Sequence, residues 1–183
     1  MEILNNRIVS ERSPDGIRAI GTTFRNNTVI RKFHELQYFK ISSTPSNAFL
    51  ESGISEFTLP STLTTIGYQT FAYCDNLTSV KLMEGVTTIG NQCFWNSRNI
   101  TLIDLPSTIT TLNNYGIHTY AASGQKNYVV ICRAATPPTL GSNNYLTNLT
   151  AVYVPDDSVS AYKTATTWSG FAAKIKPLSE YTG

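Results

Sequence analysis

Ile54-Ser-Glu-Phe-Thr-Leu-Pro60 is followed 23 residues later by Leu77-Thr-Ser-Val-Lys-Leu-Met83, and after the same interval by Ile100-Thr-Leu-Ile-Asp-Leu-Pro106. A second set of three blocks with the same spacing lies between them: Leu63-Thr-Thr-Ile-Gly67, Val86-Thr-Thr-Ile-Gly90 and Ile109-Thr-Thr-Leu-Asn113. A period in the twenties is typical of solenoids, whose units bury an apolar face only by stacking on one another. The sequence therefore predicts a β-rich solenoid of stacked 23-residue repeats.

The first set of blocks is predicted to form strands, because the first, fourth and sixth residues of each block are apolar. Successive side chains of a strand point to opposite faces, so the fourth and sixth residues share the inward face and the fifth points outward. This pattern predicts an outward column of Thr58, Lys81 and Asp104, spaced by about 4.8 Å. Leu149-Thr-Ala-Val-Tyr-Val-Pro155 repeats the block and places Tyr153 in register with that column.

The second set predicts a ribbon in which paired threonines lie between inward apolar residues. Gly67, Gly90 and Asn113 share the last position of its blocks. Since glycine and asparagine enter the left-handed backbone region most easily, we expect a positive φ at this position. Phe71 and Phe94 follow at the same spacing, and we expect them to be aromatic plugs of a continuous core.

Residues 1–39 are predicted to form an N-terminal cap ahead of a solenoid at residues 40–183, the two together making one continuous unit. Ser13-Pro14-Asp15-Gly16 favours a type I turn between the strands of a hairpin. Residues 28–39 carry apolar side chains on one helical stripe and predict an amphipathic helix. A solenoid needs its open end covered, which favours this role for the helix over the alternative of a partner-binding helix.

The repeat pattern breaks after Asn113, and residues 115–127 predict a longer loop in place of the third plug. The strand predicted at residues 128–133 is apolar on both faces. Its inward face therefore stays open between two pairs: Val129 with Ile131, and Val130 with Cys132.

The end of the chain is predicted to be a helical cap. Asp156 or Asp157 can cap a helix that runs to about Ala165. Two large aromatic residues further on, Trp168 and Phe171, can then close the solenoid, and the chain is expected to be complete there.

The composition argues against several classes of partner. Charged residues make up 14% of the 183 residues, and the formal net charge of +2 has no basic cluster behind it. Neither nucleic acid nor an anionic membrane surface is therefore an implied partner. No run approaches the ~18 apolar residues of a membrane span, so membrane insertion is not expected. The first residues lack the features of a secretory signal, which leaves either a trimmed piece or a chain not exported by that route.

No constellation of residues predicts catalysis, a metal or a cofactor. His34 and His118 have no partner at a metal-pair spacing, whereas a zinc site needs about four converging ligands. Cys74 and Cys93 occupy positions that hold small residues in neighbouring repeats, which favours buried small side chains over catalytic thiols. Whether these two pair as a disulfide stays open, because the sequence does not give their Cα separation. The carboxylates form no acid/base pair of the kind that a glycosidase needs.

Three asparagines begin triplets that match the glycosylation signal: Asn76, Asn99 and Asn148. Each of them lies directly before the first residue of a strand block. Asparagine favours turns, so we interpret these residues as turn residues rather than as glycan attachment sites.

Three segments recur together: Leu-x-x-Val/Ile-x-Leu-Pro, an apolar-Thr-Thr-Ile-Gly segment, and Phe-x-x-Cys-x-x-Leu, the last seen as Phe71-Ala-Tyr-Cys74-Asp-Asn-Leu77. This combination resembles the BspA-type bacterial leucine-rich repeats. The resemblance covers residues 40–176 and includes the ending Tyr153-Val-Pro-Asp-Asp-Ser-Val-Ser-Ala-Tyr162 with Trp168. It implies a curved solenoid without catalytic residues, and bacterial surface proteins that bind host or microbial partners. Similar repeats also occur in proteins of bacteriophages and of some eukaryotic microbes.

Two hypotheses of function follow. The first is a non-enzymatic recognition module, on a bacterial surface or secreted, that binds a protein or glycan through the strand-lined face. The second is a structural assembly module, such as a phage tail or virion component. The ligand and the oligomeric state are left open by the sequence.

The candidate ligand contacts lie on the outward column, which varies from rung to rung as recognition requires. Tyr153 is the strongest, since an exposed aromatic ring supplies contact area at low entropic cost. Lys81 and Asp104 stay open between ligand contacts and a weak surface ion pair, and Thr58 is explained as well by a solvated strand residue. The next candidates lie in the 115–127 loop: Tyr115, His118 and Tyr120.

Overall fold

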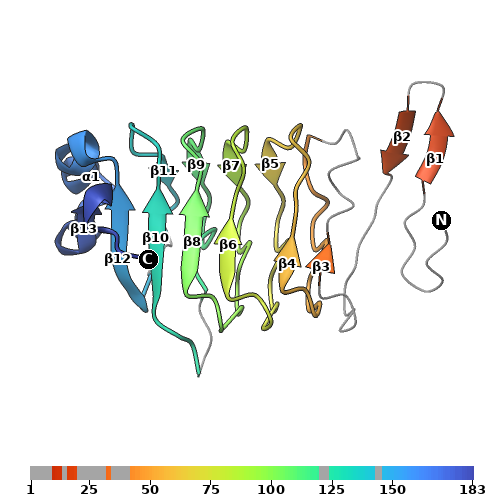
Figure 1. Cartoon of the computed structure of the whole chain (residues 1–183), viewed down its shortest axis with the longest axis horizontal. Coiled ribbons are helices and arrows are strands. Elements are labelled where there is room, and N and C mark those ends of the chain that lie inside the picture. The colour runs from red at the N-terminus through yellow and green to blue at the C-terminus, as the bar shows by residue number, and fades with distance from the viewer. Residues whose placement is uncertain (1–9, 14–15, 20–31, 34–41, 120–123, 143–145) are drawn as a thin grey trace.

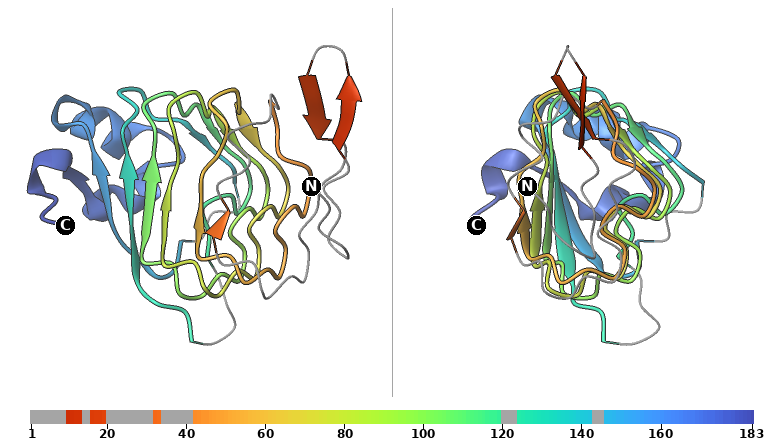
Figure 2. Two further views of the ribbon diagram at one scale, coloured as in Figure 1. Left: turned by 45° about the vertical axis from the view of Figure 1, so that its right-hand side comes forward. Right: turned by 90° about the vertical axis from the view of Figure 1, so that its right-hand side faces the viewer.

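The computed structural model describes residues 10–13, 16–19, 32–33, 42–119, 124–142 and 146–183. From residue 42 on, the described chain winds into successive coils whose strands lie side by side along the long axis (Figure 1). Viewed along that axis, the coils superimpose on one another (Figure 2). This arrangement confirms the predicted β-rich solenoid of stacked repeats.

One wall of the solenoid is a parallel five-stranded sheet, here called the ladder sheet, with strand order β13-β12-β10-β8-β6. Its register is the sequence period itself, because Val80 pairs with Ile103 and Lys81 pairs with Asp104, each 23 residues further on. The strands are β6 (Ser79–Lys81), β8 (Leu102–Leu105), β10 (Tyr128–Cys132), β12 (Leu149–Val154) and β13 (Ile175–Pro177).

A second wall is a parallel four-stranded sheet, here called the threonine sheet, with strand order β11-β9-β7-β5. Thr65 pairs with Thr88, and Thr88 pairs with Thr111, so identical residues stack on one another. The strands are β5 (Thr65–Ile66), β7 (Thr88–Ile89), β9 (Thr111–Leu112) and β11 (Thr139–Leu140).

The core lies inside the coils and is continuous along the solenoid. Phe49, Phe71 and Phe94 stack in a row, with ring centroids 5.2 Å and 5.8 Å apart and ring planes within 6° of parallel. All three rings are buried, which confirms the predicted plugs. The expectation that the 115–127 loop replaces the third plug is wrong, because Ile117 lies 23 residues after Phe94 and is fully buried. The repeat therefore keeps its core position and takes its extra residues after it.

The positive φ expected at Gly67, Gly90 and Asn113 is also wrong, since none of them has one. At Gly67 and Gly90, glycine is needed because the backbones of neighbouring coils approach too closely for a side chain. A Cβ atom on Gly90 would lie 2.6 Å from the carbonyl carbon of Gly67. The left-handed residues come two positions later in each coil: Gln69, Gln92 and Tyr115, with φ of 48°, 55° and 56°.

At the N-terminal end, β1 (Ser10–Ser13) and β2 (Gly16–Ala19) pair in antiparallel fashion. Ser13 pairs with Gly16, which confirms the hairpin predicted around this turn.

The helix predicted at residues 28–39 is wrong where the structure describes it. Strand β3 (Lys32–Phe33) pairs in parallel with β4 (Glu56–Phe57) and so forms a rung of the solenoid. A spacing of three between apolar residues, as in Ile30 and Phe33, suits a helical stripe but also matches the spacing of Ile54 and Phe57 in a strand block. Pairing with the next coil decides between the two. The boundary at residue 39 stays a prediction.

The C-terminal cap closes the last coil with hydrogen bonds from aromatic side chains. Tyr162 Oη donates to the carbonyl oxygen of Ala134, and Trp168 Nε1 donates to that of Pro138, both at 2.8 Å. The predicted cap by an aspartate is wrong, because α1 begins without a side-chain cap and Asp156 instead accepts a hydrogen bond from Ser179 N. The helices of this cap are η2 (Asp156–Ser158), α1 (Val159–Thr164), η3 (Ser169–Lys174) and η4 (Leu178–Glu180), of which the η elements are 3-10 helices.

Candidate functional site

The inward face of β10, which the sequence left open, is settled by its register with β8. Val130 pairs with Ile103, and Cys132 pairs with Leu105, whose side chains are both buried in the core. Val130 and Cys132 therefore point inward, and Val129 and Ile131 belong to the outer face.

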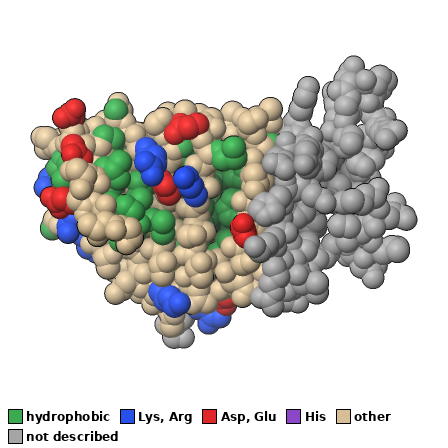
Figure 3. Space-filling view, in the orientation of Figure 1, with side chains coloured by type: hydrophobic (Ala, Val, Ile, Leu, Met, Phe, Trp, Pro, Cys, Tyr) green, Lys and Arg blue, Asp and Glu red, His purple; other side chains and the backbone are tan. Residues whose placement is uncertain are grey.

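The outer face of the ladder sheet is unusually apolar at its centre. Leu102, Val129 and Ala151 lie in one row across β8, β10 and β12. Ile131 lies between Asp104 and Tyr153 in a second row, and it is only 2% exposed. Figure 3 shows hydrophobic side chains gathered on this side of the molecule. When one face of a sheet is exposed to water, the strands alternate apolar residues on the core face with polar residues on the solvated face, so the apolar residues on this outer face depart from the usual pattern.

A groove of about 440 Å³ lies on this face, with Leu102 and Val129 among its lining residues. Tyr153 and Tyr181 line it as well, and their ring centroids are 5.0 Å apart at an angle of 61°. Tyr153 is half-buried in this position. Sequence reasoning missed Tyr181, which follows η4 and belongs to no repeat block. The sequence signal that could have revealed the groove was strand β10, which is apolar on both faces and therefore places apolar residues on the outer face.

Asp104 is buried rather than exposed, which corrects the expected outward column. Its side chain is 8% exposed, because Arg133, from the residue after β10, covers it. Arg133 Nε and Nη2 donate to the two carboxylate oxygens at 2.8 and 2.9 Å. These hydrogen bonds raise the pKa of the Arg133 guanidinium above its usual value. The ion pair considered between Asp104 and Lys81 is thus made with Arg133.

The other candidates on the outward column are only partly brought together. Lys81 is exposed and pairs in register with Asp104, and Tyr153 follows on the same row beyond Ile131. Thr58 is half-buried and lies directly after β4, outside the strand. Their role in binding a ligand stays a prediction.

Tyr115 and His118 form a separate aromatic cluster with Trp95. The His118 ring stacks on Tyr115 at a centroid distance of 5.7 Å and meets Trp95 edge-on at 5.8 Å. His118 is 2% exposed, and burial lowers its pKa from 6.5 to about 4. A neutral, buried imidazole of this kind serves packing better than contact with a ligand. Tyr120 lies outside the described residues.

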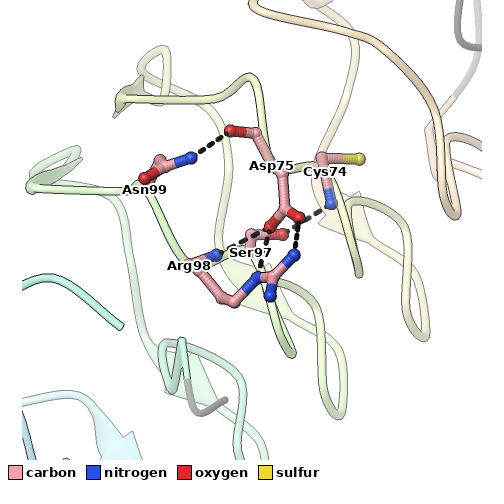
Figure 4. A network of polar contacts seen from close by, with 5 residues as sticks. All are labelled: Cys74, Asp75, Ser97, Arg98 and Asn99. Atoms are coloured by element: carbon pink, nitrogen blue, oxygen red, sulfur yellow. Dashed lines mark hydrogen bonds and ion pairs between the residues drawn. The ribbon is translucent and has the colours of Figure 1, made fainter. Parts of the chain in front are cut away.

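Polar residues at the turns between coils hold neighbouring coils together (Figure 4). Cys74 N donates to Ser97 Oγ at 2.9 Å, and Asn99 Nδ2 donates to the carbonyl oxygen of Asp75 at 2.8 Å. Burial alone would raise the pKa of the Asp75 carboxyl, but hydrogen bonds from Arg98 outweigh this effect and lower it. The side chains of the other two triplet asparagines bind backbone carbonyls in the same way, which confirms the turn role: Asn76 to Gly53 and Asn148 to Gln125.

The cysteines are buried and unpaired: Cys74, Cys93 and Cys132. Burial raises the pKa of the Cys74 thiol to about 11, so it is protonated at neutral pH. In the part of the chain that the structure describes, no group of three or more His, Cys, Asp or Glu side chains could hold a metal ion. No helix within the described ranges is both long enough and apolar enough to cross a bilayer.

The stacked coils, the period and the parallel ladder define a leucine-rich-repeat solenoid. The family described as BspA type Leucine rich repeat region matches residues 5–121 in six copies, and the chain belongs to this family. Repeats of this family suggest protein binding or adhesion, are generally not catalytic, and typically belong to bacterial proteins that are surface-located or secreted. No curated protein was found to match the chain.

Proposed function

We propose that this chain is a non-enzymatic recognition module that binds a protein or glycan partner through the outer face of the ladder sheet, on a bacterial surface or in secreted form. The observation that supports this proposal is the apolar and aromatic outer face of β8, β10 and β12, which includes Leu102, Val129 and Tyr153. Apolar and aromatic side chains on a sheet face that stays in water add no binding energy, whereas on a binding face their burial against a partner does.

A groove of similar volume, about 440 Å³, lies beside the threonine sheet with Ile109, Pro138 and Thr139 among its lining residues, but the outer threonines of this sheet repeat from rung to rung. Thr87 Oγ1 donates to the carbonyl oxygen of Thr64 at 3.2 Å, and Thr110 Oγ1 donates to that of Thr87 at 3.1 Å. These hydroxyl hydrogens are used between coils, so they are not available to a ligand. The variation of its outer residues from rung to rung favours the ladder sheet as the binding face.

Binding of the purified chain to a panel of immobilised glycans and cell-surface proteins tests the proposal. We expect Tyr153→Ala combined with Lys81→Ala to weaken binding at least tenfold, as for interface hot spots, without shifting the unfolding midpoint. The matched control is Tyr68→Ala combined with Lys163→Ala, whose side chains are exposed elsewhere. The control should bind like the wild type.

Binding that survives the Tyr153 and Lys81 changes would reject the ladder sheet as the site. Concentration-dependent self-association that these changes abolish would favour the assembly hypothesis instead, and sedimentation of the same samples measures it.

A further inference from the structure

We propose that the groove on the ladder sheet is a binding site for a neutral glycan, an inference that rests on the proposed function and names the class of its ligand. The groove lies over β8 and β10, between a rim at Thr78 and Ser79 and the rings of Tyr153 and Tyr181. Its volume of about 440 Å³ falls in the size range of small-ligand sites.

The side chains that line the groove are uncharged and rich in hydroxyl groups. Among the described residues that line it, none is acidic, basic or a histidine. An ionised ligand would lose hydration there without gaining an opposite charge from a lining side chain. A sugar can exchange hydrogen bonds with hydroxyl groups, which both donate and accept. Six of the nine lining residues carry such groups: Thr78, Ser79, Thr101, Tyr153, Tyr181 and Thr182. Thr101 Oγ1 donates to the carbonyl oxygen of Thr78 at 3.0 Å, so it can offer a ligand an acceptor only.

The apolar part of the groove suits the other side of a sugar ring. Tyr153 and Tyr181 lie at 61° to each other, so their rings form two walls of an angled surface. The face of an aromatic ring is electron-rich and attracts weakly positive C–H bonds. A pyranose presents its C–H groups on one face and its hydroxyl groups around its edge. It can therefore contact a tyrosine ring and the threonine rim at once.

The position of the groove disfavours a peptide and an anionic ligand. Strands β8 and β10 each have a hydrogen-bonded neighbour on both sides, so they present no free edge to which a peptide strand could be added. Of the cationic residues near the groove, Lys176 pairs in register with Tyr153 but is not among the lining residues. Arg133 follows the far end of β10 and binds Asp104 with two of its nitrogens. The charges therefore lie outside the groove.

Calorimetric titration of the whole chain with defined oligosaccharides tests the inference. The neutral probes are cello-, malto-, manno- and chitohexaose, and the anionic probes are oligogalacturonate and a heparin hexasaccharide. We expect a neutral hexaose to bind, and Tyr153→Ala or Tyr181→Ala to weaken its binding about tenfold or more. Tyr153→Phe keeps the ring and should retain most of the affinity. Tyr68→Ala, on an exposed tyrosine outside the groove, is the control and should change nothing.

Failure of every neutral hexaose to bind would overturn the inference, as would tighter binding of an anionic probe. An equal loss of affinity in Tyr68→Ala and Tyr153→Ala would place the site elsewhere and overturn it as well. If a protein partner binds and depends on Tyr153 and Lys81 while no neutral glycan binds, the ligand class is wrong but the proposed function stands. If no partner depends on the ladder sheet, both fail.

Discussion

The ladder sheet and the threonine sheet are walls of the same coils and share one period, yet their outer faces differ. In the threonine sheet, Thr65, Thr88 and Thr111 repeat one residue type at each rung. In the ladder sheet, Lys81 is followed at the same position by Asp104, then by Ile131 and Tyr153. The repeated threonines reflect the packing of one coil on the next. The variable residues of the ladder column are not constrained by this packing.

Hydrogen bonds between coils explain why threonine recurs, and on the ladder side Thr101 and Thr150 make the same kind of bond to Thr78 and Tyr128. On the threonine wall, the hydroxyls of Thr87 and Thr110 donate to the backbone of the previous coil, so these side chains contribute to the stacking of the coils. Lys81 and Tyr153 are not among the residues that make these hydrogen bonds between coils, so their positions can vary without weakening the stacking. Residues on the threonine side and in the turns behind it should therefore govern stability, and residues on the outer ladder face should govern binding.

Phe94→Ala is the strongest test of the contribution that the buried core makes to stability. Phe94 is fully buried and stacks on Phe71 at 5.8 Å. Removal of its ring should lower the free energy of unfolding by about 3 to 5 kcal/mol. Chemical denaturation measures the loss. Phe171→Ala, on a ring that is only half-buried, should cost clearly less, and equal losses would contradict the continuous row of plugs.

Acid should weaken the turn region through His118. Its folded pKa of about 4 lies below its ordinary value of 6.5, so the unfolded chain binds more protons between these values. The stability from neutral His118 is therefore complete above pH 6.5 and is lost as the pH falls towards 4. The loss should reach about 3 kcal/mol. Denaturation of the wild type and of His118→Gln from pH 7 to pH 4 isolates it, and parallel pH profiles would contradict the burial of this ring.

The close approach of coils at the end of the threonine blocks is tested by Gly90→Ala. The added Cβ atom would lie 2.6 Å from a backbone carbon of the previous coil, so the backbone would have to shift. We expect a loss of about 1 to 3 kcal/mol, the usual cost of overpacking. Gly170→Ala is the matched control, because a Cβ atom there meets nothing within 4 Å. Equal unfolding midpoints of the two variants would reject the close-approach explanation.

A pair of isosteric changes compares the two walls directly. Thr87→Val removes the hydroxyl that bonds to Thr64 and should cost about 0.5 to 1.5 kcal/mol, with no effect on binding. Thr78→Val, on the rim of the groove, should leave the unfolding midpoint unchanged and weaken ligand binding. Thermal unfolding and the binding titration would be run on both variants. If Thr87→Val instead weakens binding and Thr78→Val instead lowers the unfolding midpoint, the assignment of stability to the threonine wall and of binding to the ladder wall is wrong.

The sequence was sufficient for the repeat, the inward residues and the plugs because these follow from periodicity. Ile66, Ile89 and Leu112 recur at fixed intervals and are all fully buried, as alternation along a strand requires. The helix expected around Phe33 is wrong because the spacing of its apolar residues fits both a helical stripe and a strand block. Only the pairing of Phe33 with Phe57 decides for the strand.

The residues of the candidate site could be predicted from periodicity only in part. Tyr153 could be placed on the outer face from its block alone, but Tyr181 reaches it only because the chain turns back after η4. Asp104 was placed on the right face, while its burial depended on Arg133, which lies 29 residues away along the sequence. A pairwise contact between residues outside the repeat leaves no periodic signal.

The sequence by itself determined the family, the period and the identity of the core, because each rung must satisfy the same packing and hydrogen-bonding demands as its neighbours. Only the tertiary structure decided which glycines are required for close approach, which charge is covered, and which side chains surround the groove. These features depend on distances between coils and on the return of the chain from its cap, and no local rule of residue spacing contains them.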